Sequence, residues 1–136
     1  MDEIFVTRMP VRFQDIDAAG IVFFARVFDY AHDAFVAYLK HVDLPLDRML
    51  AEGTFGIPLV HAEADYKGPL RFGDDIDVRL ARPEIGDRSI KVQLSLEVGG
   101  SPRAIVRLTH VTVDRAQMQS IAVPVDWRRK LTGGAS

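Results

Sequence analysis

The sequence predicts an α+β fold in which an antiparallel sheet wraps around one long helix. Residues 24–42 follow a helical period and contain neither proline nor glycine. One strand precedes this segment, and four or five strands with alternating apolar and polar residues follow it. A single apolar helix beside a meander of strands buries both apolar surfaces only if the sheet covers the helix.

Composition limits the possible classes of protein. The 136 residues, 48% of them hydrophobic, are enough for one domain spanning residues 1–136. A net charge of −2 gives no reason to expect a nucleic-acid partner, and the absence of cysteine excludes disulfides and thiol catalysis. No apolar run reaches membrane-spanning length, and the acidic first residues lack the features of a signal peptide. We therefore expect a soluble, cytoplasmic protein with no membrane partner.

The first half of the chain is expected to hold a strand over residues 4–13, with Val6, Val11 and Phe13 as its apolar members, and then the long helix. A helical wheel places eight apolar residues in one stripe, which we expect to face the core: Phe24, Val27, Phe28, Ala31, Phe35, Tyr38, Leu39 and Val42. A short helix or turn is expected over residues 45–52.

The second half of the chain has a β pattern. Residues 57–66 alternate, with polar His61, Glu63 and Asp65 on one face. Further strands are expected over residues 76–80, 90–98 and 103–113, with a hairpin turn at Gly99-Gly100 between the last two. Residues 119–123 allow one more short strand, and Pro124 begins a turn or helix that continues to Leu131.

One stretch places a candidate catalytic side chain near the start of the long helix. The chain from Arg12 runs as a strand, turns on Ala18-Ala19-Gly20, and enters the helix at Phe24. A helix N-terminus has unpaired N–H donors and partial positive charge, which can stabilise an oxyanion. Asp17, at the turn, supplies a carboxylate that can act as base or nucleophile. This pairing indicates acyl-transfer chemistry.

The same stretch resembles a known family. The residues Asp15-Ile16-Asp17-Ala18-Ala19-Gly20-Ile21-Val22-Phe23-Phe24 resemble the signature of hot-dog-fold acyl-CoA thioesterases of the 4-hydroxybenzoyl-CoA thioesterase type. Residues 56–60, 86–89 and 121–127 also fit at similar spacing. The resemblance implies a hot-dog fold and hydrolysis of an aromatic (benzoyl-like) or short acyl-CoA, with coenzyme A as part of the substrate and no other cofactor. It also implies a homodimer that assembles to a homotetramer, with active sites at the dimer interface.

The resemblance also implies roles for individual residues. Asp17 would be the catalytic carboxylate, and the segment from Gly20 to Phe24 would form the oxyanion site, with the Phe24 backbone N–H as donor. Asp15 matches the other motif aspartate and is interpreted as structural. His32 stands where a benzoyl-specific member has an aspartate that binds the substrate's ring hydroxyl, so we expect it to contact the acyl group. The other expected contacts are Phe23 and Phe28 for the acyl group and Arg88 and Ser89 for coenzyme A.

Two other classes of function stay open. A hot-dog hydratase or dehydratase would need a histidine near the helix start, whereas His32 lies more than two turns inside the helix. A non-catalytic acyl-CoA-binding protein would bind the thioester without releasing a thiol. His61, His110, Glu63 and Asp65 do not have the spacing of a metal-ligand motif, so no metal site is expected.

Overall fold

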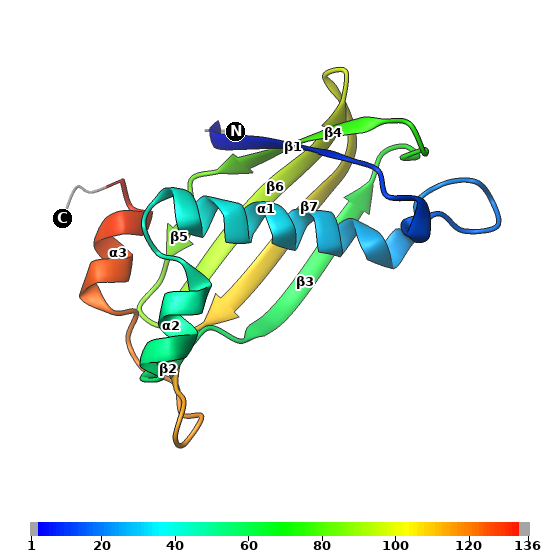
Figure 1. The fold of residues 1–136 in the computed structure, drawn as a ribbon. Helices are drawn as coiled ribbons and strands as arrows, with labels where there is room; N and C mark the ends of the chain where they lie inside the picture. The colour runs from blue at the N-terminus through cyan, green and yellow to red at the C-terminus, as the bar shows by residue number, and fades with distance from the viewer. Residues whose placement is uncertain (1–2, 134–136) are drawn as a thin grey trace.

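The structure, a computed structural model, describes residues 3–133. Figure 1 shows its elements, which in chain order are β1 (Glu3–Pro10), η1 (Phe13–Asp15), η2 (Phe24–Arg26), α1 (Val27–His41), α2 (Leu46–Glu52), β2 (Phe55–Gly56), β3 (Leu59–Tyr66), β4 (Asp75–Ala81), β5 (Glu84–Ile85), β6 (Ser89–Val98), β7 (Ser101–Val111), β8 (Val113–Asp114) and α3 (Val125–Leu131). None of the helices in this described part of the chain is both long enough and apolar enough to cross a membrane.

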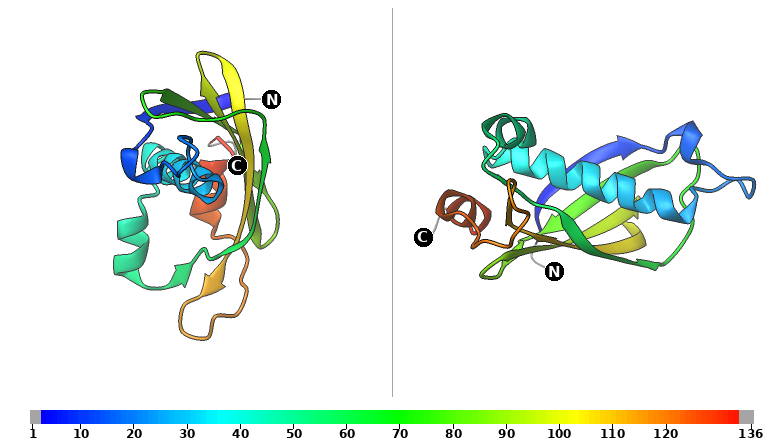
Figure 2. Two further views of the ribbon diagram at one scale, coloured as in Figure 1. Left: turned by 90° about the vertical axis from the view of Figure 1, so that its right-hand side faces the viewer. Right: turned by 90° about the horizontal axis from the view of Figure 1, so that it is seen from below.

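The main sheet is antiparallel, and α1 lies across one of its faces. Its strands follow the order β1-β4-β6-β7-β3. The short strand β5 pairs with residues 90 and 91 of β6, on the same edge of β6 that pairs with β4. The sheet curves around α1, as Figure 2 shows with the sheet seen from its edge. The predicted α+β arrangement is confirmed. β3 and β1 are the two ends of the strand order, so each has one edge without a partner strand among residues 3–133.

The core lies between α1 and the inner face of the sheet. From β6 the alternate residues Ile90, Val92, Leu94 and Leu96 are buried, as their spacing predicted. On α1 the buried side chains are Val27, Tyr30, Ala31, Ala34, Phe35, Tyr38 and Leu39. Phe24 was expected in this stripe and is instead 61% exposed. The reason is that residues 24–26 form a 3-10 turn, whose tighter period does not continue the apolar face of α1.

Two predicted strands differ from those observed. The first strand ends at Pro10, and Phe13 lies in η1 with 73% of its surface exposed. η1 is closed by hydrogen bonds from the N–H groups of Asp15 and Ile16 to the carbonyls of Arg12 and Phe13. Residues 119–123 do not form a strand, since only Ser120 makes a bridge, to Val113.

Leu94 provides a test of where the core lies. It is fully buried at the centre of β6, so Leu94→Ala should lower the free energy of unfolding by about 2–5 kcal/mol because it leaves a cavity. Leu50→Ala is the matched control, since Leu50 is 59% exposed on α2 and its truncation should cost less than about 0.5 kcal/mol. Equal losses for the two variants, measured by chemical denaturation, would contradict this packing.

Candidate active site

The turn that carries Asp17 is fixed by its own backbone. The Gly20 N–H donates to the Asp17 carbonyl at 3.0 Å, and the Asp17 N–H donates to the Ile21 carbonyl at 2.9 Å. Gly20 has φ +82°, which a residue with a side chain rarely adopts. The Asp17 carboxylate accepts one hydrogen bond, from the Ala19 N–H to Oδ1 at 2.8 Å. This bond orients the carboxylate at the tip of the turn.

The helix start faces the same side of the molecule. Phe24 is the first residue of η2, so its backbone N–H has no acceptor within the helix. The Tyr66 hydroxyl, from the end of β3, donates to the Phe24 carbonyl at 2.5 Å. The Phe23 N–H donates to the Asp15 carbonyl at 2.9 Å. These two bonds hold the start of the helix between the last residue of β3 and the preceding loop.

Asp17 and Phe24 both line a cavity of about 500 Å³. Its apolar walls include Phe23, Phe24 and Leu70, and Lys67 and Arg103 contribute cations. Asp17 and the helix start therefore border one space, as the sequence predicted. Gly20 shapes the turn and does not line this cavity. The arrangement puts a carboxylate, a helix N-terminus and an apolar surface around the same volume, which suits attack on a carbonyl group.

A buried carboxylate anchors the loop behind this cavity. Asp15 is 5% exposed, and its Oδ2 accepts from the Tyr30 hydroxyl at 2.6 Å and from Arg12 Nε at 2.9 Å. The Tyr30 hydroxyl in turn accepts from the Arg12 backbone N–H at 2.9 Å. The Arg12 guanidinium also lies 4.4 Å from the centre of the Tyr30 ring. The side chain and carbonyl of Asp15 thus tie the loop to α1 and to the helix start, which supports its interpretation as structural.

These contacts decide the ionisation of Asp15. Burial alone would raise the pKa of this carboxyl, but the hydrogen bonds from Tyr30 and Arg12 and the charges of Arg12 and Arg26 together outweigh burial and lower it. Asp15 is therefore a carboxylate at neutral pH, and its negative charge offsets the two arginines that approach it.

His32 and Phe28 border a different space in the same chain. Both line a cavity of about 490 Å³ between α1 and the start of β3. His32 also lines a neighbouring cavity of about 340 Å³. Within one chain, these two predicted substrate contacts therefore line a different cavity from that of Asp17 and Phe24.

Arg88 and Ser89 lie at the far end of the sheet from Asp17. Ser89 begins β6, and the β6 residue level with Tyr66, through Ala104, is Leu96. Seven residues of strand separate the two levels, a distance of about 23 Å at about 3.3 Å per residue. Arg88 Nη1 donates to Ser120 Oγ at 2.9 Å. The structure thus does not bring these residues to Asp17 within one chain.

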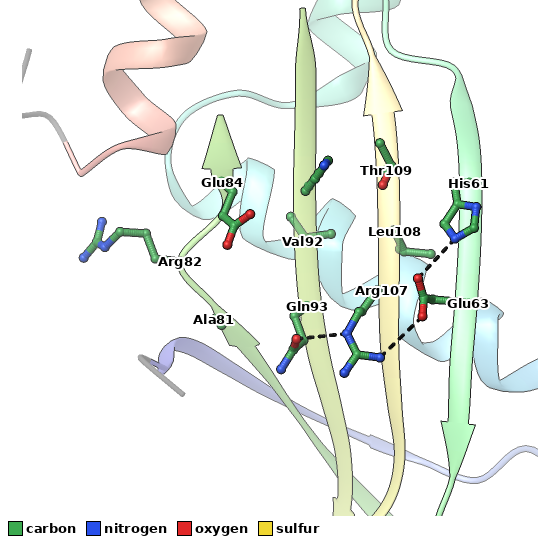
Figure 3. Close-up of a pocket in the computed structure, with 11 residues that line it drawn as sticks. His61, Glu63, Ala81, Arg82, Glu84, Val92, Gln93, Arg107, Leu108 and Thr109 are labelled. Atoms are coloured by element: carbon green, nitrogen blue, oxygen red, sulfur yellow. Dashed lines mark hydrogen bonds and ion pairs between the residues drawn. The ribbon is translucent and has the colours of Figure 1, made fainter. Parts of the chain in front are cut away.

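A further cavity, of about 920 Å³, lies on the outer face of the sheet. Figure 3 shows Arg107 of β7 between Gln93 and Glu63. Arg107 Nε donates to Gln93 Oε1 at 3.2 Å, and His61 Nε2 lies 3.1 Å from Glu63 Oε1. His61, Glu63 and Asp65 share this face, as their alternation predicted. No group of three or more His, Cys, Asp or Glu side chains in residues 3–133 is placed to hold a metal ion.

Some residues of the site were not identified from the sequence. These are Tyr66 and Arg103, which line the cavity of Asp17. Their contribution depends on the pairing of β3 with β7, which brings residues 66 and 104 together. Tyr30 was not placed in the apolar stripe, although a tyrosine on a helix facing a buried aspartate is a frequent anchor.

Comparison with known proteins agrees with this geometry. Residues 11–131 match the family model of the thioesterase-like superfamily. The 1,4-dihydroxy-2-naphthoyl-CoA hydrolase of Synechococcus elongatus is 30% identical over 121 residues, which cover 86% of this chain and 89% of that protein. The corresponding hydrolase of Trichodesmium erythraeum is 32% identical and covers 80% and 81% of the two chains.

Solved structures show the same fold. The 1,4-dihydroxy-2-naphthoyl-CoA thioesterase from Synechocystis superposes with a TM-score of 0.89 at 23% identity, covering 95% of this chain and 96% of that one. A gentisyl-coenzyme A thioesterase superposes with a TM-score of 0.83 at 26% identity, covering 91% and 99%. The fold is thus the hot-dog fold, and the class is that of thioester-hydrolysing enzymes. The chain belongs to the thioesterase-like superfamily. These comparisons do not assign the chain to the 4-hydroxybenzoyl-CoA thioesterase type, so that narrower assignment stays a prediction.

Tyr30→Phe tests the anchor of the active-site loop. Loss of the hydroxyl removes a hydrogen bond to a buried carboxylate and should lower the free energy of unfolding by about 1–3 kcal/mol at pH 7. The pKa of Asp15 is lowered in the folded protein, so its stabilising effect is complete above the unfolded pKa, near 4, and is lost as pH falls through the folded value. The difference between variant and wild type, measured by urea denaturation, should therefore shrink in acid. A difference that stays constant to the lowest pH at which the protein folds would contradict this account.

Proposed function

We propose that this enzyme hydrolyses the thioester of an aromatic acyl-CoA to the free acid and coenzyme A. The observation that carries the proposal is the shared cavity of Asp17 and the helix start at Phe24. A thioester carbonyl seated there would have its carbon beside the carboxylate and its oxygen beside the Phe24 N–H. Coenzyme A enters as part of the substrate, and the reaction needs no other cofactor.

The carboxylate has two routes to the same products. As a base, Asp17 takes a proton from water, whose oxygen attacks the carbonyl carbon. As a nucleophile, it attacks the carbon itself, and water then hydrolyses the mixed anhydride. In both routes the carbonyl oxygen becomes negatively charged, and the Phe24 N–H and the helix N-terminus stabilise it. When this oxyanion collapses, the carbon–sulfur bond breaks, and the thiolate of coenzyme A leaves and takes up a proton. In the nucleophilic route this step forms the mixed anhydride and precedes its hydrolysis.

The walls of the site support an aromatic acyl group. Phe23 and Phe24 have their rings 4.8 Å apart, and Tyr66 packs against Phe24 with ring centres 6.5 Å apart. Such surfaces bind flat rings well. By their names, the relatives described above act on 1,4-dihydroxy-2-naphthoyl and gentisyl thioesters. The acyl groups of both thioesters are hydroxylated aromatic rings. A benzoyl-like or larger aromatic thioester is therefore the substrate class that we propose.

We also propose that the site is completed by a second subunit. β3 is exposed along nearly its whole length, and its apolar residues Leu59, Val60 and Tyr66 are 47%, 57% and 48% exposed. Its free edge can pair with the same edge of another copy around a two-fold axis. We further propose that two such dimers form a tetramer, for which the outer face offers charges of both signs around Arg107 and Glu63.

Two-fold pairing joins the two halves of the predicted site. If the β3 strands pair antiparallel about a two-fold axis at Glu63, the residues of each face stay on one face, and Val60 of the partner subunit lies opposite Tyr66 with Leu59 beside it. The partner's cavity of Phe28 and His32, which Leu59 also lines, then adjoins the cavity of Asp17. In this arrangement Arg88 of the partner subunit lies at the same end of the joined sheet as Asp17. This accounts for His32 as an acyl contact and for Arg88 and Ser89 as contacts of the coenzyme A phosphates.

Asp17→Asn is the direct test of the chemistry. The variant keeps the shape of the turn but removes the base or nucleophile, so thiol release from aromatic acyl-CoAs should fall by roughly 10²–10⁴-fold. The assay follows free thiol with a chromogenic reagent. Asp47→Asn, which changes an exposed carboxylate on α2, is the control and should retain wild-type turnover.

Two outcomes would contradict this function. Wild-type turnover by Asp17→Asn would remove the carboxylate from the mechanism. Hydration of an enoyl-CoA by the wild-type enzyme without thiol release would indicate the hydratase alternative, and tight binding of acyl-CoA with no reaction would indicate a binding protein.

Val60→Asp tests the dimer. β3 already carries Glu63 and Asp65, so an added carboxylate at its exposed edge meets like charge from the partner and disfavours pairing. Sedimentation velocity should show dissociation to monomers, together with loss of thiol release. Val6→Asp places the same charge at the opposite edge, on β1, where Val6 is 47% exposed, and should change neither property. A fully active monomer would refute the composite site.

A further inference from the structure

One histidine of the core has hydrogen-bonding groups that nothing in the described chain uses. His110, on the inner face of β7, is 1% exposed, and its ring stacks on Phe35 with centres 4.8 Å apart. Neither ring nitrogen has a hydrogen-bond partner among residues 3–133. A buried polar group without a partner is rare in folded proteins and calls for an explanation, of which a functional role is one.

The surroundings of His110 indicate what kind of ligand it would meet. His110 lines a cavity of about 340 Å³ between α1, α2 and the segment before β3, with mainly apolar walls: Leu46, Met49, Leu50, Gly56, Ile57, Pro58, Val113 and Met118. Arg115 also lines this cavity, and its Nη1 donates to the Leu50 carbonyl at 2.8 Å. His32 lines the same cavity, and its ring centre is 5.9 Å from that of His110. An apolar pocket with very few polar groups is the usual form of a site for a small aromatic group.

We propose that His110 is a specificity-determining residue that hydrogen-bonds a ring hydroxyl of the aromatic acyl group, whose distal part enters this cavity beside His32. This inference rests on the proposed function and on the dimer proposed with it. It extends the site beyond His32 to a second imidazole, which spacing in the sequence did not indicate.

The chemistry of the ring favours a hydroxyl over a charged group. Burial, and to a smaller extent the nearby His32, lowers the pKa of His110 to about 4, so the ring is neutral at pH 7. A neutral imidazole has one donor and one acceptor, which match the acceptor and donor of a hydroxyl. A carboxylate, or a fully ionised phosphate, has only acceptors, so it would use the ring's donor and leave the ring's acceptor unmatched.

The position of His110 suits the partner subunit's active site rather than its own. Within one chain, six residues of β7 separate His110 from Ala104, the residue level with Tyr66, a distance of about 20 Å. In the proposed dimer, Leu59 of the partner subunit lies beside the residue opposite Tyr66, and His110 pairs with Leu59. His110 of the partner subunit would then lie two strand spacings from Tyr66, or about 10 Å, on the same face of the sheet. An aromatic acyl group can span this distance.

The test compares substrates that differ only in ring hydroxyls. The pairs are 1,4-dihydroxy-2-naphthoyl-CoA with 2-naphthoyl-CoA, and gentisyl-CoA with benzoyl-CoA. For each enzyme the ratio of kcat/KM within a pair gives its preference for the hydroxylated substrate. The intrinsic reactivity of each thioester is the same for both enzymes, so it cancels when the ratio of a variant is divided by that of the wild type.

His110→Phe keeps a ring against Phe35 and removes both nitrogens. We expect it to lower the preference by about 10-fold or more in at least one pair, while kcat/KM for the unsubstituted thioester stays within about 2-fold of wild type. His41→Phe, at the exposed end of α1, is the control and should leave both values unchanged. Equal losses for both members of each pair, or an unchanged preference, would overturn the proposal.

A second measurement does not depend on the folding of His110→Phe. In the Asp17→Asn variant, the imidazole ¹⁵N signals of the chain's 4 histidines can be assigned by single His→Gln substitutions. Binding of 1,4-dihydroxy-2-naphthoyl-CoA should shift the His110 signals, and binding of 2-naphthoyl-CoA should leave them unchanged. Saturated binding of the dihydroxy thioester without a shift at His110 would refute the role. Failure of the wild-type enzyme to release thiol from any of these thioesters would instead refute the proposed function.

Discussion

The candidate active site depends on a carboxylate that does not line its cavity. Asp15 is buried behind the loop and holds the Tyr30 hydroxyl and the Arg12 guanidinium with its side chain. Its carbonyl accepts from the Phe23 N–H, the residue before the helix start. Because one residue binds α1, the segment that follows β1 and the helix entrance, the loop between them has little freedom. The tip of that loop carries Asp17, so the distance between the carboxylate and the Phe24 N–H is set by this anchor.

Much of the fold could be predicted from local patterns. The alternation of β6 and the helical period of residues 24–42 are both local, and both agree with the structure. The predicted strand and helix boundaries that were wrong lie where the local backbone conformation overrides the apolar pattern of the sequence. Phe13 continues an apolar alternation, yet the hydrogen bonds of η1 turn the chain and leave the ring exposed. Phe24 fails for a similar reason, because the 3-10 turn that begins the helix does not share the period of α1.

The candidate site was predictable only where it is local. Asp17, the turn and the helix start lie within eight residues, so their proximity follows from the chain itself. Tyr66, Arg103 and His110 lie on strands whose pairing is set by the whole sheet, and no short motif marks them. His32 and Arg88 were placed by resemblance, and in a single chain they lie away from Asp17. The site between subunits that we propose would leave such a separation, since its parts need not be close within one chain.

The exposure of β3 connects these findings. An edge strand with apolar residues on its inner face is a liability for a monomer, because it can pair with any other free edge. In the proposed dimer, pairing with a second copy would remove this liability. The antiparallel geometry proposed for that pairing would also bring the start of one β3, with His110 beside it, to the end of the other, with Tyr66 and the helix start. The exposed edge is thus the edge at which the proposed dimer would join its two half-sites, so one eight-residue strand would serve both assembly and catalysis.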